Sequence, residues 1–263
     1  MDILEKIVAA KKIEVAERKR ETPLSNLTQM GQFKEPCFSL KKALKRANSS
    51  GIIAEHKRKS PSLGWIKEGA NVRDITTGYA QAGAAAISCL TDELFFGGTM
   101  SDLRTVRRAI EIPILRKDFM IDEYQVFEAK ANGADVILLI AECLSHKEVK
   151  HLSRVAKDLG MEVLLEMHAA EELDKICDTV DCVGINNRNL KTFSVSIQTS
   201  IDLSAQIPDS FVKIAESGIS NPETIQILRG YGFEGFLIGE AFMKTENPGQ
   251  SLQKFVGMMQ KVA

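Results

Sequence analysis

Short apolar runs recur along the chain from residue 51 onwards, and longer stretches with helical spacing of apolar and polar positions separate them. The runs are nearly continuous and rich in β-branched residues, which is typical of strands buried on both faces. The intervening stretches predict helices, for example at residues 99–110, 123–132, 146–159 and 221–229. The eight predicted strands are residues 51–54, 85–90, 112–115, 134–140, 161–165, 182–185, 211–215 and 235–238.

Eight strands that alternate with helices predict an α/β fold, a closed (β/α)8 TIM barrel. The alternative is a doubly wound open sheet, which usually has fewer strands and a glycine-rich first turn. The chain contains no GxGxxG motif. Residues 1–50 precede the first strand, and we expect them to form extra N-terminal helices. Because no linker or low-complexity segment interrupts the pattern, residues 1–263 are predicted to form a single barrel domain.

The composition, with 44% hydrophobic and 26% charged residues, is ordinary for a soluble globular protein. A formal net charge of -1 provides no basic surface, so we expect neither nucleic acid nor an anionic membrane as a partner. No apolar run approaches the length of a transmembrane helix. The first residues carry acids among their apolar positions, which favours an amphipathic helix over a signal peptide.

The spacing of cysteines and histidines indicates the cellular compartment and whether the chain binds a metal ion. The five cysteines are an odd number without a CxxC pair, which indicates reduced thiols and a cytoplasmic location. The histidines, His56, His146, His151 and His168, show neither HxH nor HExxH spacing. We therefore predict no metal site.

Polar residues cluster at the carboxyl ends of the predicted strands, where barrel enzymes hold their active sites. Side chains alternate along an extended chain, so Glu55 and Lys57 are expected on one face and His56 on the other. Taken singly, such residues also fit a salt-bridged strand end or a solvated rim. Together they predict an active site, and the later strand ends contribute Lys117, Glu166, Asn186, Glu216, Ser217, Gly239 and Glu240.

Glu166 follows an apolar run, so its carboxyl is expected to be partly desolvated. Burial raises the pKa of a carboxyl and makes it a plausible proton donor. A neighbouring lysine would oppose that shift, and the sequence leaves the protonation state of Glu166 open.

The last two strand ends favour a phosphorylated small-molecule substrate. Gly218 and Gly239 stand where a backbone would have to approach an anion closely, and short helix N-termini after these strands would supply N–H donors. Glu240 would contribute its backbone N–H, since its carboxylate repels phosphate. Ser60 lies in a Ser-Pro-Ser turn that also suits an anion.

The order and spacing of these motifs resemble the indole-3-glycerol phosphate synthase family over nearly the whole chain. The resemblance implies ring closure of 1-(2-carboxyphenylamino)-1-deoxyribulose 5-phosphate to indole-3-glycerol phosphate, with loss of carbon dioxide and water, in tryptophan biosynthesis. It also implies that no metal or organic cofactor is needed. The matching segments are residues 53–62, 114–119, 165–168, 184–190, 215–219 and 236–240.

The resemblance also assigns roles to residues. Lys117 would be the general acid that protonates the substrate ketone, and Lys57 would pair with the substrate carboxylate. Glu55 and Glu166 would handle protons during dehydration. The other matching residues are Asn186 and Ser217, which would orient hydroxyls and catalytic groups; Phe96 and Phe119, an apolar wall; Arg188, Leu190 and Glu216, which would border the substrate; and Ser60, Gly218, Gly239 and Glu240, which would hold the phosphate.

Two other functions stay open at this point. A phosphoribosyl-type isomerase would typically carry an Asp or Cys pair at the ends of strands one and five, where this chain has Glu55 with Lys57 and Glu166. A catalytically silent barrel scaffold should have lost Lys117 or Glu166, and both are present. We expect a monomer or weak homodimer. The sequence does not decide whether the N-terminal helices pack over the active-site mouth or against a partner.

Overall fold

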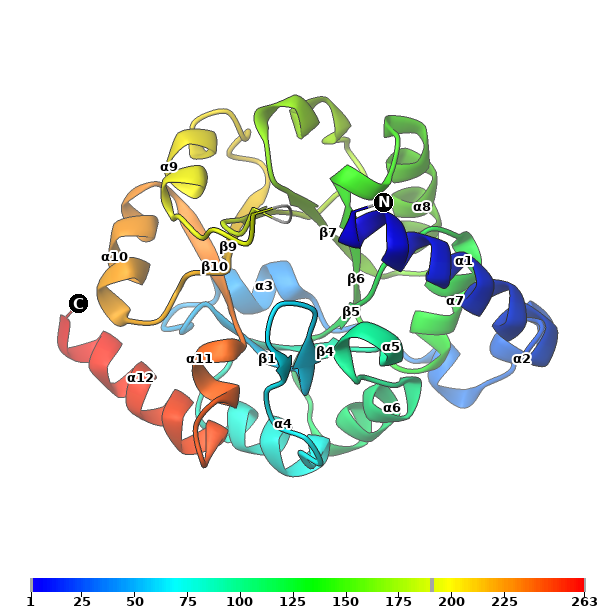
Figure 1. The fold of residues 1–263 in the computed structure, drawn as a ribbon, viewed down its shortest axis with the longest axis horizontal. Coiled ribbons are helices and arrows are strands. Elements are labelled where there is room, and N and C mark those ends of the chain that lie inside the picture. Colours follow the sequence, from blue (N-terminus) through cyan, green and yellow to red (C-terminus); the bar gives the residue numbers. More distant parts are fainter. Residues whose placement is uncertain (1, 190–191, 263) are drawn as a thin grey trace.

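The computed structural model describes residues 2–189 and 192–262, and its centre is a closed barrel (Figure 1). The strands pair in the order β1-β10-β9-β8-β7-β6-β5-β4, and every neighbouring pair is parallel. The predicted (β/α)8 barrel is therefore confirmed. The barrel strands are β1 (Ile52–His56), β4 (Ala86–Leu90), β5 (Ile114–Lys117), β6 (Val136–Ile140), β7 (Glu162–Met167), β8 (Cys182–Asn186), β9 (Val212–Glu216) and β10 (Phe233–Ile238).

Several strands extend further at their carboxyl ends than their apolar runs predicted. Glu55 pairs in register with Ser88, and Asn186 pairs with Glu216. Polar residues can continue these strands because their side chains point into the open mouth of the barrel. A polar side chain is tolerated there even though the strand backbone is buried. A hairpin of β2 (Lys59–Ser60) and β3 (Gly64–Trp65) lies in the loop after β1, which the sequence pattern left without strands.

Helices surround the barrel (Figure 1), and each of the four predicted helical stretches overlaps one of them. Capping boxes define the starts of α6, α7 and α8, whose caps are Thr99, Asp122 and Ser145. The helical elements after β1 are α4 (Val72–Gln81), α5 (Glu93–Phe96), α6 (Met100–Ala109), α7 (Glu123–Ala131), η2 (Ala141–Cys143), α8 (His146–Asp158), η3 (Ala170–Lys175), α9 (Gln198–Ser204), α10 (Pro222–Gly230), α11 (Glu240–Met243) and α12 (Pro248–Val262).

Alternation along the strands divides the core into two clusters. On β1, Ile53 belongs to the cluster inside the barrel, whereas Ile52 and Ala54 belong to the cluster between barrel and helices. Leu40 and Leu44 of α3 (Leu40–Lys45) join the inner cluster. The helix α3 therefore packs apolar side chains against the barrel interior.

Three further helical elements precede α3, namely α1 (Ile3–Glu21), α2 (Leu24–Leu27) and η1 (Gly31–Lys34). Figure 1 shows α1, in blue, near α7 and α8. No described helix is both long and apolar enough to cross a membrane.

His56 lies on the outward face of β1, as alternation predicted, and its side chain is buried. Burial lowers its pKa to about 4, and the nearby Arg58 adds to the effect, so the imidazole is neutral near pH 7. We expect a His56→Phe variant to keep its turnover number within about tenfold, since no proton transfer depends on this ring. Steady-state kinetics on protein with native circular dichroism would test this, and a hundredfold loss would assign His56 a role in the reaction.

Candidate active site

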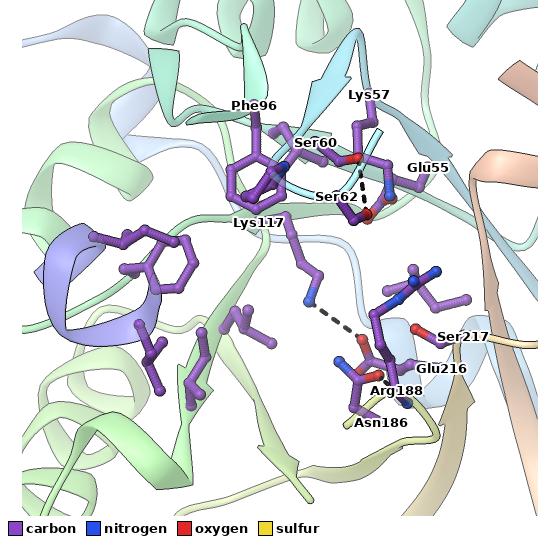
Figure 2. Close-up of a pocket in the computed structure, with 18 of the residues that line it drawn as sticks. Glu55, Lys57, Ser60, Ser62, Phe96, Lys117, Asn186, Arg188, Glu216 and Ser217 are labelled. Atoms are coloured by element: carbon purple, nitrogen blue, oxygen red, sulfur yellow. Dashed lines mark hydrogen bonds and ion pairs between the residues drawn. The ribbon is translucent and has the colours of Figure 1, made fainter. Parts of the chain in front are cut away.

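A pocket opens at the carboxyl ends of the strands, where the sequence predicted the site (Figure 2). Glu166 lies beside the pocket, where it contacts Lys117, while Gly218 and Gly239 lie outside its lining. Leu190 lies outside the described residues. The predicted residues that line the pocket are Glu55, Lys57, Ser60, Phe96, Lys117, Phe119, Asn186, Arg188, Glu216, Ser217 and Glu240.

Lys117 stands at the centre of a buried lysine–carboxylate cluster. Its Nζ lies 2.5 Å from Glu166 Oε2 and 3.2 Å from Glu216 Oε2. The amide of Asn186 donates to the other oxygen of Glu166, at 3.0 Å. A second pair joins Lys57 Nζ to Glu55 Oε1 at 2.6 Å, so Glu55 and Lys57 do share one face. The inward positions of β1, β5, β7, β8 and β9 thus converge on one volume.

The cluster separates the pKa values of its two central carboxyls. Burial would raise the pKa of Glu166, but the charge of Lys117 and the hydrogen bonds from Lys117 and Asn186 lower it to about 2. Burial, reinforced by the charge of Glu166, raises the pKa of Glu216 to about 8 despite Lys117. Burial also opposes the charge on Lys117, yet Glu166, Glu216 and Glu55 together raise its pKa above the usual value. These shifts favour an ammonium on Lys117, an ionised Glu166 and a Glu216 that holds a proton more readily than an ordinary glutamate.

These directions bear on the protonation question that the sequence left open. Lys117 outweighs the desolvation of Glu166 and favours its ionised form. Glu216, expected from the sequence only to border the substrate, is the carboxyl whose pKa is raised. In the sequence, Glu216 could have been recognised by its position at the end of a predicted strand. In the structure it pairs with Asn186 of the neighbouring strand.

One wall of the pocket is apolar. The rings of Phe96 and Phe119 lie 6.0 Å apart between centroids, tilted by 36°. Ile3, Leu4 and Ile7 of α1 also line the pocket, so this helix packs at the active-site mouth. The sequence showed the amphipathic spacing of these three residues, but it did not show that they pack over the active-site mouth.

A buried ion cluster holds α1 in this place. Lys11 Nζ lies 2.9 Å from Asp92 Oδ2 and 2.8 Å from Asp118 Oδ1, and its side chain is 1% exposed. Burial lowers the pKa of Lys11, but the surrounding carboxylates outweigh it and raise the pKa above its usual value. On the other side, Asp118 accepts from the fully buried Arg116. Sequence analysis missed Lys11 because nothing local distinguishes it from Lys12.

Gly218 and Glu240, two of the residues predicted to hold phosphate, lie next to Ser217 in the chain and beside Arg188 in space, respectively. Ser217 and Gly218 both adopt left-handed backbone conformations, with φ of 65° and 74°. Such a conformation is unusual for serine and typical of strained functional sites. Arg188 Nη2 lies 3.3 Å from Glu240 Oε2. Lys244 also bonds this carboxylate, at 2.6 Å.

Gly239 has a steric role that the sequence did not reveal. A Cβ at this position would lie 2.6 Å from Glu55 Oε1 and 2.9 Å from Glu55 Cβ. Position 239 therefore requires glycine because the side chain of Glu55 packs closely against its backbone. The approach of an anion to the backbone at Gly239 stays a prediction.

The fold and site define a (β/α)8-barrel enzyme with lysine and carboxylate groups at the mouth. A family model described as indole-3-glycerol phosphate synthase matches residues 4–255. The chain belongs to the indole-3-glycerol phosphate synthase family. Membership supports that activity, a carboxy-lyase step of tryptophan biosynthesis, for this chain.

Relatives agree with this assignment. An indole-3-glycerol phosphate synthase of Bacteroides thetaiotaomicron is 50% identical over 260 residues, which cover 98% of this chain and 99% of the relative. One of Bordetella pertussis is 41% identical over 259 residues, with 97% and 99% covered.

Two solved structures resemble the fold alone. KGPDC from Streptococcus mutans has a TM-score of 0.59 at 13% identity, covering 73% of this chain and 92% of that one. Thiamine phosphate pyrophosphorylase from Pyrococcus furiosus has a TM-score of 0.60 at 15% identity, covering 85% and 99%.

Proposed function

We propose that Lys117 is the general acid of the ring closure. A new carbon–carbon bond joins the aromatic carbon that bears the carboxylate to the ketone carbon, and Lys117 gives its proton to the ketone oxygen. Carbon dioxide then leaves, and the new hydroxyl departs as water in the dehydration. The observation that carries this proposal is the position of Lys117 Nζ between Glu166 and Glu216 in the pocket.

Lys57 would hold the substrate carboxylate, with the aromatic ring against Phe96 and Phe119. Binding both ends of the anthranilate group brings the ring carbon close to the ketone, and such positioning supplies a large share of a cyclisation barrier. Glu55 and Glu166 would accept and return protons during dehydration, and Glu216, whose pKa is raised by burial, would be a third proton carrier. Asn186 would keep Glu166 oriented through its amide.

The phosphate would bind on the side of Ser60, Ser217–Gly218 and Gly239–Glu240. Arg188 supports this assignment, since it lines the pocket and supplies a guanidinium close to Glu240. The carboxylate of Glu240 is engaged by Arg188 and Lys244, which reduces its repulsion of a phosphate. Its backbone N–H would then act as the donor.

The decisive experiment adds the carboxyphenylamino-deoxyribulose phosphate to purified protein in the presence of EDTA and follows indole-type fluorescence. Growth of the emission is expected, without added metal. A flat trace from folded protein would reject this function for the site and favour the isomerase or scaffold alternatives. Trapping released carbon dioxide distinguishes the synthase reaction from an isomerisation, which releases none.

We also infer a cytoplasmic location and a monomer or weak homodimer. All five cysteines are free thiols, which supports a reducing compartment. Light scattering across a concentration series would test the oligomeric state, and a concentration-independent higher oligomer would contradict it.

A further inference from the structure

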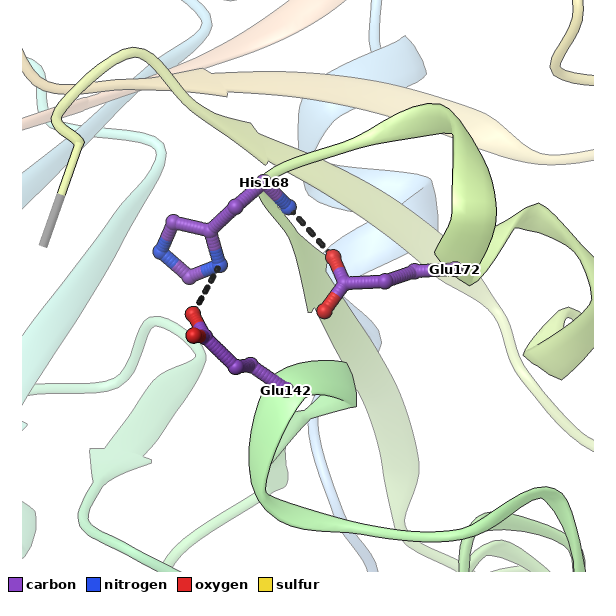
Figure 3. A group of neighbouring side chains, drawn as sticks. All are labelled: Glu142, His168 and Glu172. Carbon is purple, nitrogen blue, oxygen red and sulfur yellow. Dashed lines mark hydrogen bonds and ion pairs between the residues drawn. The ribbon is translucent and has the colours of Figure 1, made fainter. Parts of the chain in front are cut away.

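Three side chains from two neighbouring turns meet beside the active site, outside the pocket that holds the substrate residues (Figure 3). Glu142 belongs to η2, which follows β6, and Glu172 belongs to η3. His168 lies between them, directly after β7. One ligand atom from each side chain can be chosen so that all three lie within 4.8 Å of one another.

We propose that Glu142, His168 and Glu172 form a binding site for a divalent late transition metal ion of the zinc class. One imidazole nitrogen and two carboxylate oxygens suit such an ion, whereas magnesium and calcium prefer oxygen ligands alone. A tetrahedral zinc ion would leave its fourth position to water. Sequence spacing did not reveal this set, because Glu142 is remote from the other two in the chain.

The imidazole of His168 provides the independent observation. Both of its ring nitrogens are buried, and neither has a hydrogen-bond partner among the described residues. Nδ1 lies 4.0 Å from Glu142 Oε2, too far for a hydrogen bond, and the Glu172 carboxylate lies near the same edge of the ring (Figure 3). A buried polar atom without a partner is costly, and a cation on Nδ1 would satisfy it.

The charges around the ring also favour a cation. Among the described residues, neither Glu142 nor Glu172 forms an ion pair with a lysine or arginine, so two carboxylates face one imidazole without compensation. The ammonium of Lys175, in the same 3-10 helix as Glu172, donates to the backbone oxygen of Ala141, which ties η3 to η2. A surface pocket lined by all three ligands provides a path for the ion.

The geometry needs only a small closure. Donor atoms around a tetrahedral zinc ion lie roughly 3.3–3.6 Å apart, whereas the three ligand atoms here lie within 4.8 Å of one another. The carboxylate of Glu142 would therefore have to move toward His168 and Glu172 by about 1 Å or less. Its side chain is 32% exposed and free to make that movement. Glu172 is held more firmly, since one of its oxygens accepts the backbone N–H groups of His168 and Ala169.

The far side of the same ring faces the active site. His168 Nε2 lies 3.4 Å from Glu166 Oε1. A metal on Nδ1 would leave the ring proton on Nε2, and a rotation of the ring would let it donate to Glu166, as metal-bound histidines commonly donate to a carboxylate. Occupancy of the site would therefore add a donor to Glu166 without touching the substrate.

The test is a titration of the full-length protein with Co²⁺, followed by visible absorption, and with Zn²⁺, followed by calorimetry. We expect one ion per chain, with affinity at least tenfold weaker in Glu142→Gln and His168→Gln. Glu172→Gln should also weaken binding while its amide oxygen still accepts the N–H of His168, so the fold of the turn is preserved. Circular dichroism would verify that each variant is folded.

His151 and Glu123 form a matched control pair, exposed on the surface at 3.0 Å. A His151→Gln variant should bind as tightly as the original chain. Equal affinity in all variants, or no binding at millimolar metal, would overturn the proposal. An intense near-ultraviolet thiolate band would overturn it as well, because it would assign the ion to cysteine.

Discussion

Replacing Lys117 with alanine is expected to lower the turnover number by about 10³–10⁴-fold, with a much smaller change in KM. The ammonium of Lys117 contacts both Glu166 and Glu216, and its removal deletes the proton proposed for the ketone oxygen. It also leaves two buried carboxyls without their shared cation, so both should become harder to ionise. Steady-state and single-turnover kinetics with the natural substrate would measure the loss.

Lys59→Ala is the matched control for this result. Lys59 belongs to the hairpin after β1, and its ammonium donates to the backbone oxygen of Leu94 outside the pocket lining. Its removal should leave the turnover number within about threefold, as expected for a lysine without contact to the reacting atoms. Undiminished turnover in Lys117→Ala would remove Lys117 from the mechanism. Circular dichroism must show native structure in both variants.

The largest effect on stability is expected from Lys11→Met, which should lower the free energy of unfolding by about 3 kcal/mol. Removing one partner of a buried ion cluster leaves Asp92 and Asp118 desolvated without this cation. Asp118 keeps Arg116, and detachment of α1 would rehydrate both carboxylates. The loss of folding stability is therefore limited to the free energy needed to detach α1 from the active-site mouth. Urea denaturation followed by circular dichroism would measure it.

Detachment of α1 would also affect the site. Ile3, Leu4 and Ile7 would leave the apolar wall of the pocket, so KM should rise in Lys11→Met. Lys12→Met makes the same chemical change at the neighbouring, exposed position and should shift stability by less than about 0.5 kcal/mol. Unchanged denaturation and unchanged KM in Lys11→Met would show that the ion cluster does not hold α1.

The sequence by itself determined the barrel and most of the residues at its mouth. Eight buried runs separated by helices admit few architectures, and strand alternation alone assigns Glu55 and Lys57 to one face and His56 to the other. The convergence of Lys117, Glu166 and Asn186 follows as soon as parallel strands close, because their carboxyl ends meet at one rim. Local pattern therefore sufficed wherever a side chain's direction depends only on its own strand.

Only the tertiary structure decided the properties that depend on distances between segments. Burial and the charge of Glu166 raise the pKa of Glu216 despite Lys117, while the same lysine outweighs burial at Glu166 and lowers its pKa. Lys11 is a buried anchor because Asp92 and Asp118 reach it from two strand ends. Coulomb energies and desolvation depend on such separations and on exclusion of water, and neither can be obtained from residue order before the chain has folded.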